Sequence, residues 1–219
     1  VTSRNRGSGF LALPRELDRF LEEIFKSCPM TVSIKTRIGV EDEEEWPQLL
    51  EIFEKYPLEE LIIHPRLKTD QYKKNTIHWE AFKKAEESSR HSLCYNGDIV
   101  SKDDYEKVVQ RFPGTEKIMI GRGILKKPWL AEEISNGDKK DSSRYKEELF
   151  EFHEELLKGY MDYMSGDRNT LYKMKELWAY LGTSFTNPER YMKKIRKSQH
   201  ISEYRIWVGN LFREQDLIW

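Results

Sequence analysis

The sequence predicts an α/β fold in which a parallel sheet is followed by a separate all-helical part. Between residues 30 and 134, short apolar segments alternate four times with amphipathic ones, which is typical of parallel strands joined by crossover helices. Each apolar segment ends in polar residues or glycine, and beyond residue 143 only helical periodicity remains. The alternation by itself fits any α/β domain, of which a (β/α)8 barrel is one.

The chain is expected to begin with a loop and a helix. Residues 1–12 are polar and contain glycine, which favours a loop. Pro14 is well placed to start a helix that runs to Phe25. The apolar side chains of that segment follow helical spacing, at Leu17, Phe20, Leu21 and Ile24.

The remaining elements of the α/β part follow at short intervals. Strands are expected at residues 30–37, 61–66, 92–98 and 117–123, and helices at 46–56, 79–89, 103–112 and 128–134. Pro65 is expected to end the second strand, because proline cannot donate to the ladder. The Asn96-Gly97 pair is expected to end the third.

A polar stretch at residues 135–143 separates the α/β part from the helical part. Helices are expected at 144–163, 169–180, 187–197 and 202–212. We therefore expect two domains, residues 1–138 and residues 139–219.

Composition excludes several classes of protein. The 219 residues are 38% hydrophobic and 34% charged, and apolar runs such as 61–63 are far too short to span a membrane. The first residues contain no apolar signal-peptide region, and two cysteines give neither a disulfide framework nor metal-ligand spacing. The sequence thus indicates a cytoplasmic protein with no membrane segment and no metal site.

Polar chemistry is concentrated where the four predicted strands end, at residues 35–37, 64–66, 96–98 and 121–123. The carboxyl ends of barrel strands line the active face of such folds. The alternative is that these are ordinary loop residues, a serious rival for Asn96-Gly97 alone because that pair is common in turns.

The segment Gly121-Arg122-Gly123 has a specific chemical interpretation. Glycines let backbone N–H groups approach a phosphate, and a following helix adds its dipole. Arg122 adds a charge-assisted contact. The segment is therefore a candidate phosphate site, although a single Gly-Arg-Gly is a weak signal.

Taken together, the motifs resemble the tRNA-dihydrouridine synthase family. The resemblance lies in IKTRIG at 34–39, IHPR at 63–66, YNGDI at 95–99 and MIGRG at 119–123, in this order and spacing. It extends to RGSGFL at 6–11, Pro128-Trp129 and KMKELW at 173–178, and so covers nearly the whole chain.

The resemblance implies the C-terminal half of a TIM (β/α)8 barrel, followed by a small all-α helical domain that binds tRNA. It also implies FMN as cofactor and NADPH or NADH as reductant. The reaction would pass hydride to the C5–C6 bond of a uridine in tRNA, after which a cysteine protonates C5.

Residue roles follow from the same match. Lys35 would contact the flavin ring, and His64 would lie beside flavin and substrate as a candidate catalytic residue. Arg66 would order the site or hold RNA, and Arg37 would contact RNA. The ribityl-phosphate side would be held by Asn96, Gly97, Asp98, Gly121 and Arg122.

The family's cysteine belongs to an Asn-x-x-Cys-Pro segment, which would lie upstream of Val1. Cys94 is expected to be a buried strand residue and Cys28 a structural residue at a helix end. The 219-residue chain is therefore expected neither to reduce tRNA nor to hold FMN tightly. Its open sheet edges are expected to favour self-association.

The last helices carry a basic cluster between residues 189 and 213. With the resemblance, Lys193, Lys194, Arg196 and Lys197 are expected to contact RNA phosphates, whereas the aromatic residues nearby are expected in the core. Two alternatives remain: an FMN-dependent barrel oxidoreductase that acts on a small molecule, and a non-catalytic RNA-binding fragment.

Overall fold

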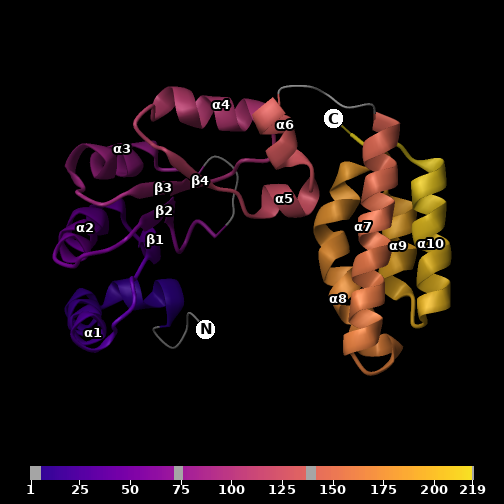
Figure 1. Cartoon of the computed structure of the whole chain (residues 1–219), viewed down its shortest axis with the longest axis horizontal. Coiled ribbons are helices and arrows are strands. Elements are labelled where there is room, and N and C mark those ends of the chain that lie inside the picture. Colours follow the sequence, from indigo (N-terminus) through magenta and orange to yellow (C-terminus); the bar gives the residue numbers. More distant parts are fainter. Residues whose placement is uncertain (1–5, 72–75, 137–141, 219) are drawn as a thin grey trace. The chain divides into compact units, whose positions relative to one another are not determined.

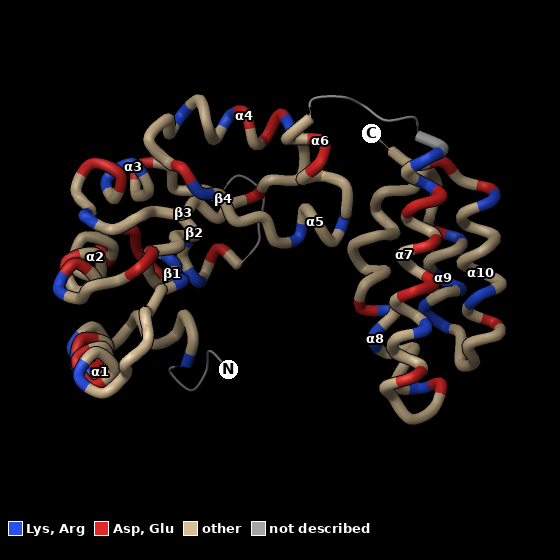
Figure 2. Tube along the Cα trace, in the orientation of Figure 1, with Lys and Arg blue, Asp and Glu red and all other residues tan. Residues whose placement is uncertain are grey.

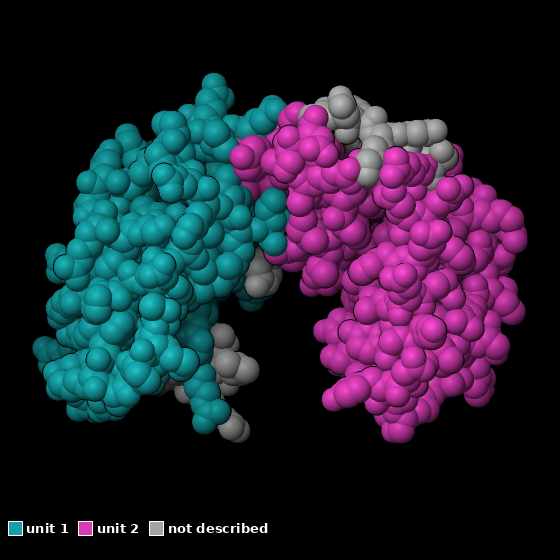
Figure 3. Space-filling view, viewed as in Figure 1, with its two compact units in different colours: residues 1–98, 106–120 teal, residues 99–105, 121–219 magenta. Residues whose placement is uncertain are grey.

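The computed structural model describes residues 6–71, 76–136 and 142–218. The chain forms two compact units, the first made of residues 1–98 and 106–120 and the second of residues 99–105 and 121–219 (Figure 3). The domain boundary expected between residues 138 and 139 falls within 137–141, outside the described residues.

The first unit contains a four-stranded parallel sheet, which confirms the predicted α/β class. Its strands pair in chain order: β1 (Ile34–Gly39), β2 (Leu61–Leu67), β3 (Leu93–Asn96) and β4 (Lys117–Met119). One face of the sheet is lined by α1 (Pro14–Ser27), α2 (Trp46–Glu54), α3 (Trp79–Ser88) and α4 (Lys102–Arg111) (Figure 1).

Alternation along each strand decides which side chains meet these helices. Tyr95 of β3 is 1% exposed, stacks on Trp79 at 5.9 Å between ring centroids and meets the edge of Phe82 at 5.1 Å. Tyr95 therefore faces the helices. Because neighbouring residues of a strand point to opposite faces, Cys94 and Asn96 belong to the other face.

Several expected strand limits are corrected by the structure, and the third strand, expected at 92–98, is β3 at Leu93–Asn96. β2 does not end at Pro65 but continues to Leu67, because a register shift gives β2 one extra residue where Arg37 and Gly39 pair with His64 and Leu67. Such a bulge accommodates a residue that lacks an N–H group. β1 begins at Ile34 rather than residue 30, since its first partner is Leu61, where β2 starts.

Several short helices were not predicted, among them the 3-10 helices η3 (Glu43–Glu45) and η4 (Gly182–Ser184). Residues expected as a loop form a 3-10 helix, η2 (Gly7–Ala12), which buries Leu11. β4 ends at Met119 rather than at residue 123, and α5 (Arg122–Lys126) begins before the helix expected from Pro128.

The second unit is mainly helical, as expected for this part of the chain. Its elements are α5, α6 (Leu130–Asn136), α7 (Ser142–Tyr163), α8 (Gly166–Leu181), η4 (Gly182–Ser184), α9 (Glu189–Lys197) and α10 (Ile201–Glu214). A single antiparallel bridge joins Phe185 and Leu217. Among the described residues, no helix combines the length and apolar character that crossing a membrane requires.

The core of this unit contains a buried polar contact. The Trp178 indole Nε1 donates to the Tyr204 hydroxyl at 2.5 Å, and His153 Nε2 lies 2.6 Å from the same oxygen. All three residues are fully buried. The contact joins α7, α8 and α10, and the large apolar residues packed around it include Leu157, Met174, Leu181, Phe185 and Leu211.

Candidate functional site

The sheet face opposite the helices carries charged and polar groups. In the parallel register, Lys35 pairs with Ile62 and Ile62 with Cys94, so these three point to the same face. Arg37 and His64 form the next pair toward the carboxyl ends of the strands. The structure therefore brings Lys35, Arg37 and His64 to one face. The expected end of the first strand at residues 35–37 is wrong, because β1 continues to Gly39 and Lys35 is its second residue.

Lys35 is an exposed cation of this face, as is Lys117, which pairs with Cys94 in the sheet register. Partial desolvation and the neighbouring charge of Arg37 lower the pKa of its ammonium group. Lys35 can therefore donate hydrogen bonds to an electron-rich group placed over the face, such as a ring nitrogen or carbonyl oxygen.

Asn96 and Gly97 end β3 in a fixed geometry. The Asn96 amide donates to the carbonyl of Met119 at 2.8 Å, which ties the ends of β3 and β4 together. A Cβ atom on Gly97 would overlap the ring of Tyr95. Glycine at this position thus has a packing reason, and the cofactor role predicted for both residues stays a prediction.

Arg66 is a buried cation that orders the strand ends. Its side chain is 0% exposed and pairs with the carboxylate of Asp98, which is 38% exposed. Of the two roles expected for Arg66, its burial supports the ordering of the site. His64, two residues before Arg66 in β2, is only 7% exposed.

Arg37 fixes the chain that follows β2. Its guanidinium donates to the carbonyl of Leu67 at 2.6 Å and to that of Gln71 at 3.4 Å. Gln71 adopts a positive φ of 52°, a conformation that is uncommon for residues other than glycine. The predicted RNA contact of Arg37 stays a prediction, because the structure shows this side chain holding a loop.

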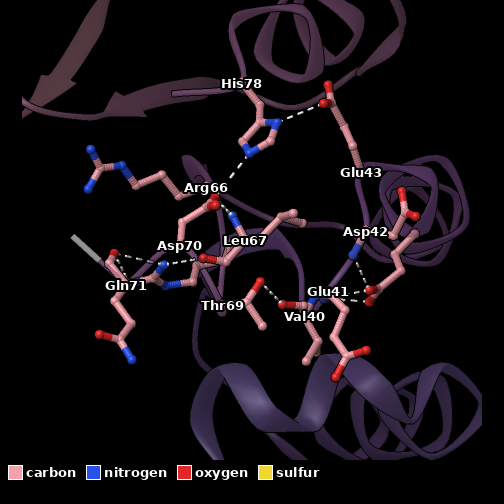
Figure 4. Close-up of polar contacts among 12 residues, drawn as sticks. Val40, Glu41, Asp42, Glu43, Arg66, Leu67, Thr69, Asp70, Gln71 and His78 are labelled. Carbon is pink, nitrogen blue, oxygen red and sulfur yellow. Dashed lines mark hydrogen bonds and ion pairs between the residues drawn. The ribbon is translucent and has the colours of Figure 1, made fainter. Parts of the chain in front are cut away.

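The loops after β1 and β2 are joined by His78 (Figure 4). His78 Nδ1 lies 2.7 Å from Glu43 Oε2, and Nε2 lies 3.0 Å from Asp70 Oδ2. Asp70 also accepts the Leu67 backbone N–H at 2.7 Å. Burial opposes the charged imidazole, but the two carboxylates together raise the pKa of His78.

The same two loops share backbone hydrogen bonds. Lys68 N–H donates to Gly39 at 3.0 Å and Thr69 N–H to Val40 at 3.1 Å. Asp42 and Glu45 form a reciprocal capping box at the start of the next helical turn. Sequence reasoning missed this network; the Asp42-x-x-Glu45 spacing was its one local signal.

Gly121 and Arg122 lie in the second unit, at the start of α5. A Cβ atom on Gly121 would meet open space, and Arg122 is exposed. α5 has only five residues, so its dipole is weak and any anion contact here depends on backbone N–H groups and the guanidinium. Their phosphate role stays a prediction.

The second unit also carries the basic cluster expected to contact RNA. Four cations are exposed on α9: Lys193, Lys194, Arg196 and Lys197. The charged residues of α7, in contrast, are mainly acidic (Figure 2). None of the four forms an ion pair with another described residue. The nearby Tyr191, Tyr204 and Phe212 are buried, as expected of core aromatics.

Neither cysteine is placed as a nucleophile. Cys94 is 4% exposed, and burial raises the pKa of its thiol to about 11. Cys28 is partly exposed and follows the last residue of α1. Both positions agree with the structural roles expected from the sequence. The described residues contain no group of three or more His, Cys, Asp or Glu side chains that could hold a metal ion.

Comparison with known proteins gives a consistent result. A family model described as dihydrouridine synthase (Dus) matches residues 1–211. A tRNA-dihydrouridine(16) synthase of Vibrio parahaemolyticus is 24% identical over 94% of this chain and 65% of its own length. A probable tRNA-dihydrouridine synthase 2 of Bacillus subtilis is 30% identical over 71% of this chain and 48% of its own length.

A probable tRNA-dihydrouridine synthase of Helicobacter pylori is 26% identical over 82% of this chain and 53% of its own length. The chain thus spans about half to two thirds of these three relatives. Because the family model covers almost all of the sequence, and with it both the strand ends and the basic helix α9, the chain belongs to the dihydrouridine synthase family.

Proposed function

We propose that a full-length protein containing this chain reduces uridine to dihydrouridine in tRNA, with FMN as cofactor and NADPH or NADH as reductant. Family membership and the names of the relatives support the reaction. The observation that carries the proposal is the placement of Lys35, Arg37 and His64 on one face of two adjacent parallel strands, with Arg37 and His64 nearer the carboxyl ends.

We also propose that the sheet is the C-terminal half of a TIM (β/α)8 barrel, with residues 1–138 as barrel domain and 139–219 as helical tRNA-binding domain. Strands in chain order with helices along one face support a barrel, since doubly wound sheets carry helices on both faces. In barrels the strand ends form the active face.

The residues on this face fit a flavin. When bound, FMN would supply the hydride for the C5–C6 bond of uridine. Lys35 offers an exposed donor for the electron-rich ring, and a positive charge there tunes a flavin. His64 is held beside Arg37, where it can orient the substrate. The Arg66–Asp98 pair fixes the end of β3 beneath them.

The remaining cofactor contacts rest on the sequence match. Asn96, Gly97 and Asp98 are proposed for the ribityl side, and Gly121 and Arg122 for the phosphate. The open space at Gly121 supports close approach of a ligand to the backbone.

The proposed partner is tRNA, which places the protein in the cytoplasm. The exposed cations of α9 support RNA binding, because clustered Lys and Arg neutralise phosphates. The target uridine must leave its stack to reach a site on the sheet face, as in other enzymes that act on a base. The contribution proposed for Arg37 to RNA binding is indirect: its side chain holds a loop, and the loop is proposed to contact RNA.

The test uses a full-length protein containing this chain, incubated with unmodified tRNA and NADPH. Dihydrouridine is measured by nucleoside mass spectrometry, and flavin by its absorbance. Lys35→Met is expected to lower product formation at least about 100-fold, which is the scale for one electrostatic donor at a reacting centre.

The matched control is Lys84→Met, at an exposed lysine of α3 on the helical side of the sheet. It is expected to behave as wild type. Turnover of a small enone without retention of tRNA would contradict the proposal and favour a small-molecule oxidoreductase. Equal activity of Lys35→Met and wild type would remove the role proposed for Lys35.

A further inference from the structure

The helical unit contains a hollow of about 400 Å³ between the end of α8 and one face of α9. Its volume is within the range of small-ligand sites. Because α8, η4 and α9 follow one another closely in the chain and share the core of the unit, the hollow is part of one folded body.

The floor of the hollow is apolar. Ala179, Pro188 and Met192 contribute to it, and Gly182 brings the backbone close to the Met192 side chain. Trp178 is fully buried beneath and supports this floor from the core. A flat, weakly polar group would be desolvated favourably here.

The rim of the hollow is cationic. Lys193, Arg196 and Lys197 line it together with Glu189. The spacing from Glu189 is four, seven and eight residues, which places all four on one face of α9. The three cations are exposed and make no ion pair with any residue that the structure describes, and Glu189 is the one acidic residue among those that line the hollow.

We infer that this hollow binds one unstacked nucleotide of RNA, its base on the apolar floor and its flanking phosphates on the cationic rim. The inference rests on the proposed tRNA binding and deepens it. Apolar and guanidinium surfaces accept the face of any base, and lysines attract phosphates. Glu189 can accept a hydrogen bond from an amino or imino group of the base.

Both halves of the chemistry are required for this assignment. An apolar peptide segment would not need a rim with three cations, and a free anion would not need an apolar floor. A nucleotide in single-stranded RNA has both a flat base and charged phosphates, and single-stranded loops expose such bases. The occupant is therefore an unpaired loop nucleotide.

The test fills the hollow without changing its charge. Ala179 and Thr183 are exposed residues of its wall, and Ala179→Leu with Thr183→Leu narrows it. Affinity of the 219-residue chain is measured by fluorescence anisotropy against a tRNA transcript and against a fully paired RNA duplex. The filled variant is expected to bind tRNA about tenfold more weakly and the duplex unchanged.

A charge variant separates the two contributions. Lys193→Gln with Lys197→Gln is expected to weaken binding to both RNAs, whereas Lys158→Gln, at an exposed lysine of α7, is expected to weaken neither. Thr183→Leu alone repeats the filling test with a smaller change, and far-UV circular dichroism checks that each variant is folded.

If the filled variants bind tRNA as tightly as wild type, the nucleotide site is refuted while tRNA binding stands. An equal loss of affinity for tRNA and for the duplex also refutes it. The effect of filling the hollow would then not depend on an unpaired base. If the wild-type chain binds neither RNA at low salt, the RNA-binding role of the helical unit fails, and the site fails with it.

Discussion

Charged groups around the strand ends have partners within the protein that the cations of α9 lack among the described residues. On the sheet side, Arg66 pairs with Asp98, Arg37 holds two carbonyl groups, and His78 lies between two carboxylates. On α9, Lys193 and Arg196 form no ion pair with a described residue although they lie on a strongly basic helix.

This difference separates charges that stabilise the fold through internal partners from charges that are exposed to solvent. A buried or bridging charge must be compensated inside the fold, since an uncompensated one is costly. An exposed lysine is solvated by water and remains available to a polyanion. The charges of the sheet side thus fix loops, whereas the cations of α9 are available to the RNA proposed as partner.

The largest expected effect concerns the buried imidazole of the helical unit. Burial, and then the charge of Arg205, lower the pKa of His153 to about 4, against an ordinary 6.5. The neutral form is native, so its stabilisation is complete above pH 6.5 and is lost as pH falls toward 4. The shift corresponds to about 3 kcal/mol.

Chemical denaturation at several pH values, monitored by helical circular dichroism, measures this loss. His153→Gln removes the titrating group and is expected to flatten the dependence between pH 6.5 and 4. An acid slope that is the same in wild type and variant would show that His153 is not its source.

The next effect concerns the paired charges of the sheet side. Asp98→Ala removes the carboxylate that faces the fully buried Arg66. Loss of one partner of a buried pair costs several kcal/mol. Because Asp98 is more than a third exposed and water partly replaces it, we expect about 2 kcal/mol of destabilisation in urea unfolding. Glu51→Ala, at an exposed position of α2, is the control and is expected to change little.

The sequence predicted the elements that show a local periodic pattern. It did not predict the features that depend on contacts between residues distant in the sequence. The apolar periodicity located β2, α1 and the helices α7, α8, α9 and α10, because each pattern is local. The predicted end of β2 at Pro65 was wrong, since the bulge that extends the strand depends on the register with β1. No local pattern marks His78, whose partner Glu43 lies 35 positions away in sequence.

The candidate site was predicted in part for the same reason. Lys35, Arg37 and His64 share one face because side chains alternate along β1 and β2 and the two strands pair in parallel register, whereas the predicted carboxyl-end position of Lys35 was wrong. The burial of Arg66 and the loop contact of Arg37 depend on tertiary packing, which the sequence does not display.

The smallest effect concerns the bridge between the two loops. The pKa of His78 is raised, so its charged bridge is complete below about pH 6.5 and is lost as pH rises through the raised value. The sign is opposite to that of His153. A bridge of this partly exposed kind contributes about 1 kcal/mol or less.

Hydrogen exchange of the Leu67, Lys68 and Thr69 amides measures the bridge, since these groups hold the loop. Exchange, corrected for its intrinsic pH dependence, is expected to accelerate at alkaline pH in wild type. In His78→Gln it is expected to be fast at all pH values. Equal protection in both proteins would contradict a role of His78 in joining the loops.

The contrast between paired and available charges is tested most directly by the salt dependence of tRNA binding. Affinity of the 219-residue chain is measured from low to moderate salt for wild type and for Lys193→Gln with Arg196→Gln. For every phosphate that the variant no longer neutralises, the slope of log affinity against log salt is expected to fall by about 1. A reduced slope in this variant, with no change for Lys84→Gln on α3, is the expected result; an unchanged slope would contradict the account.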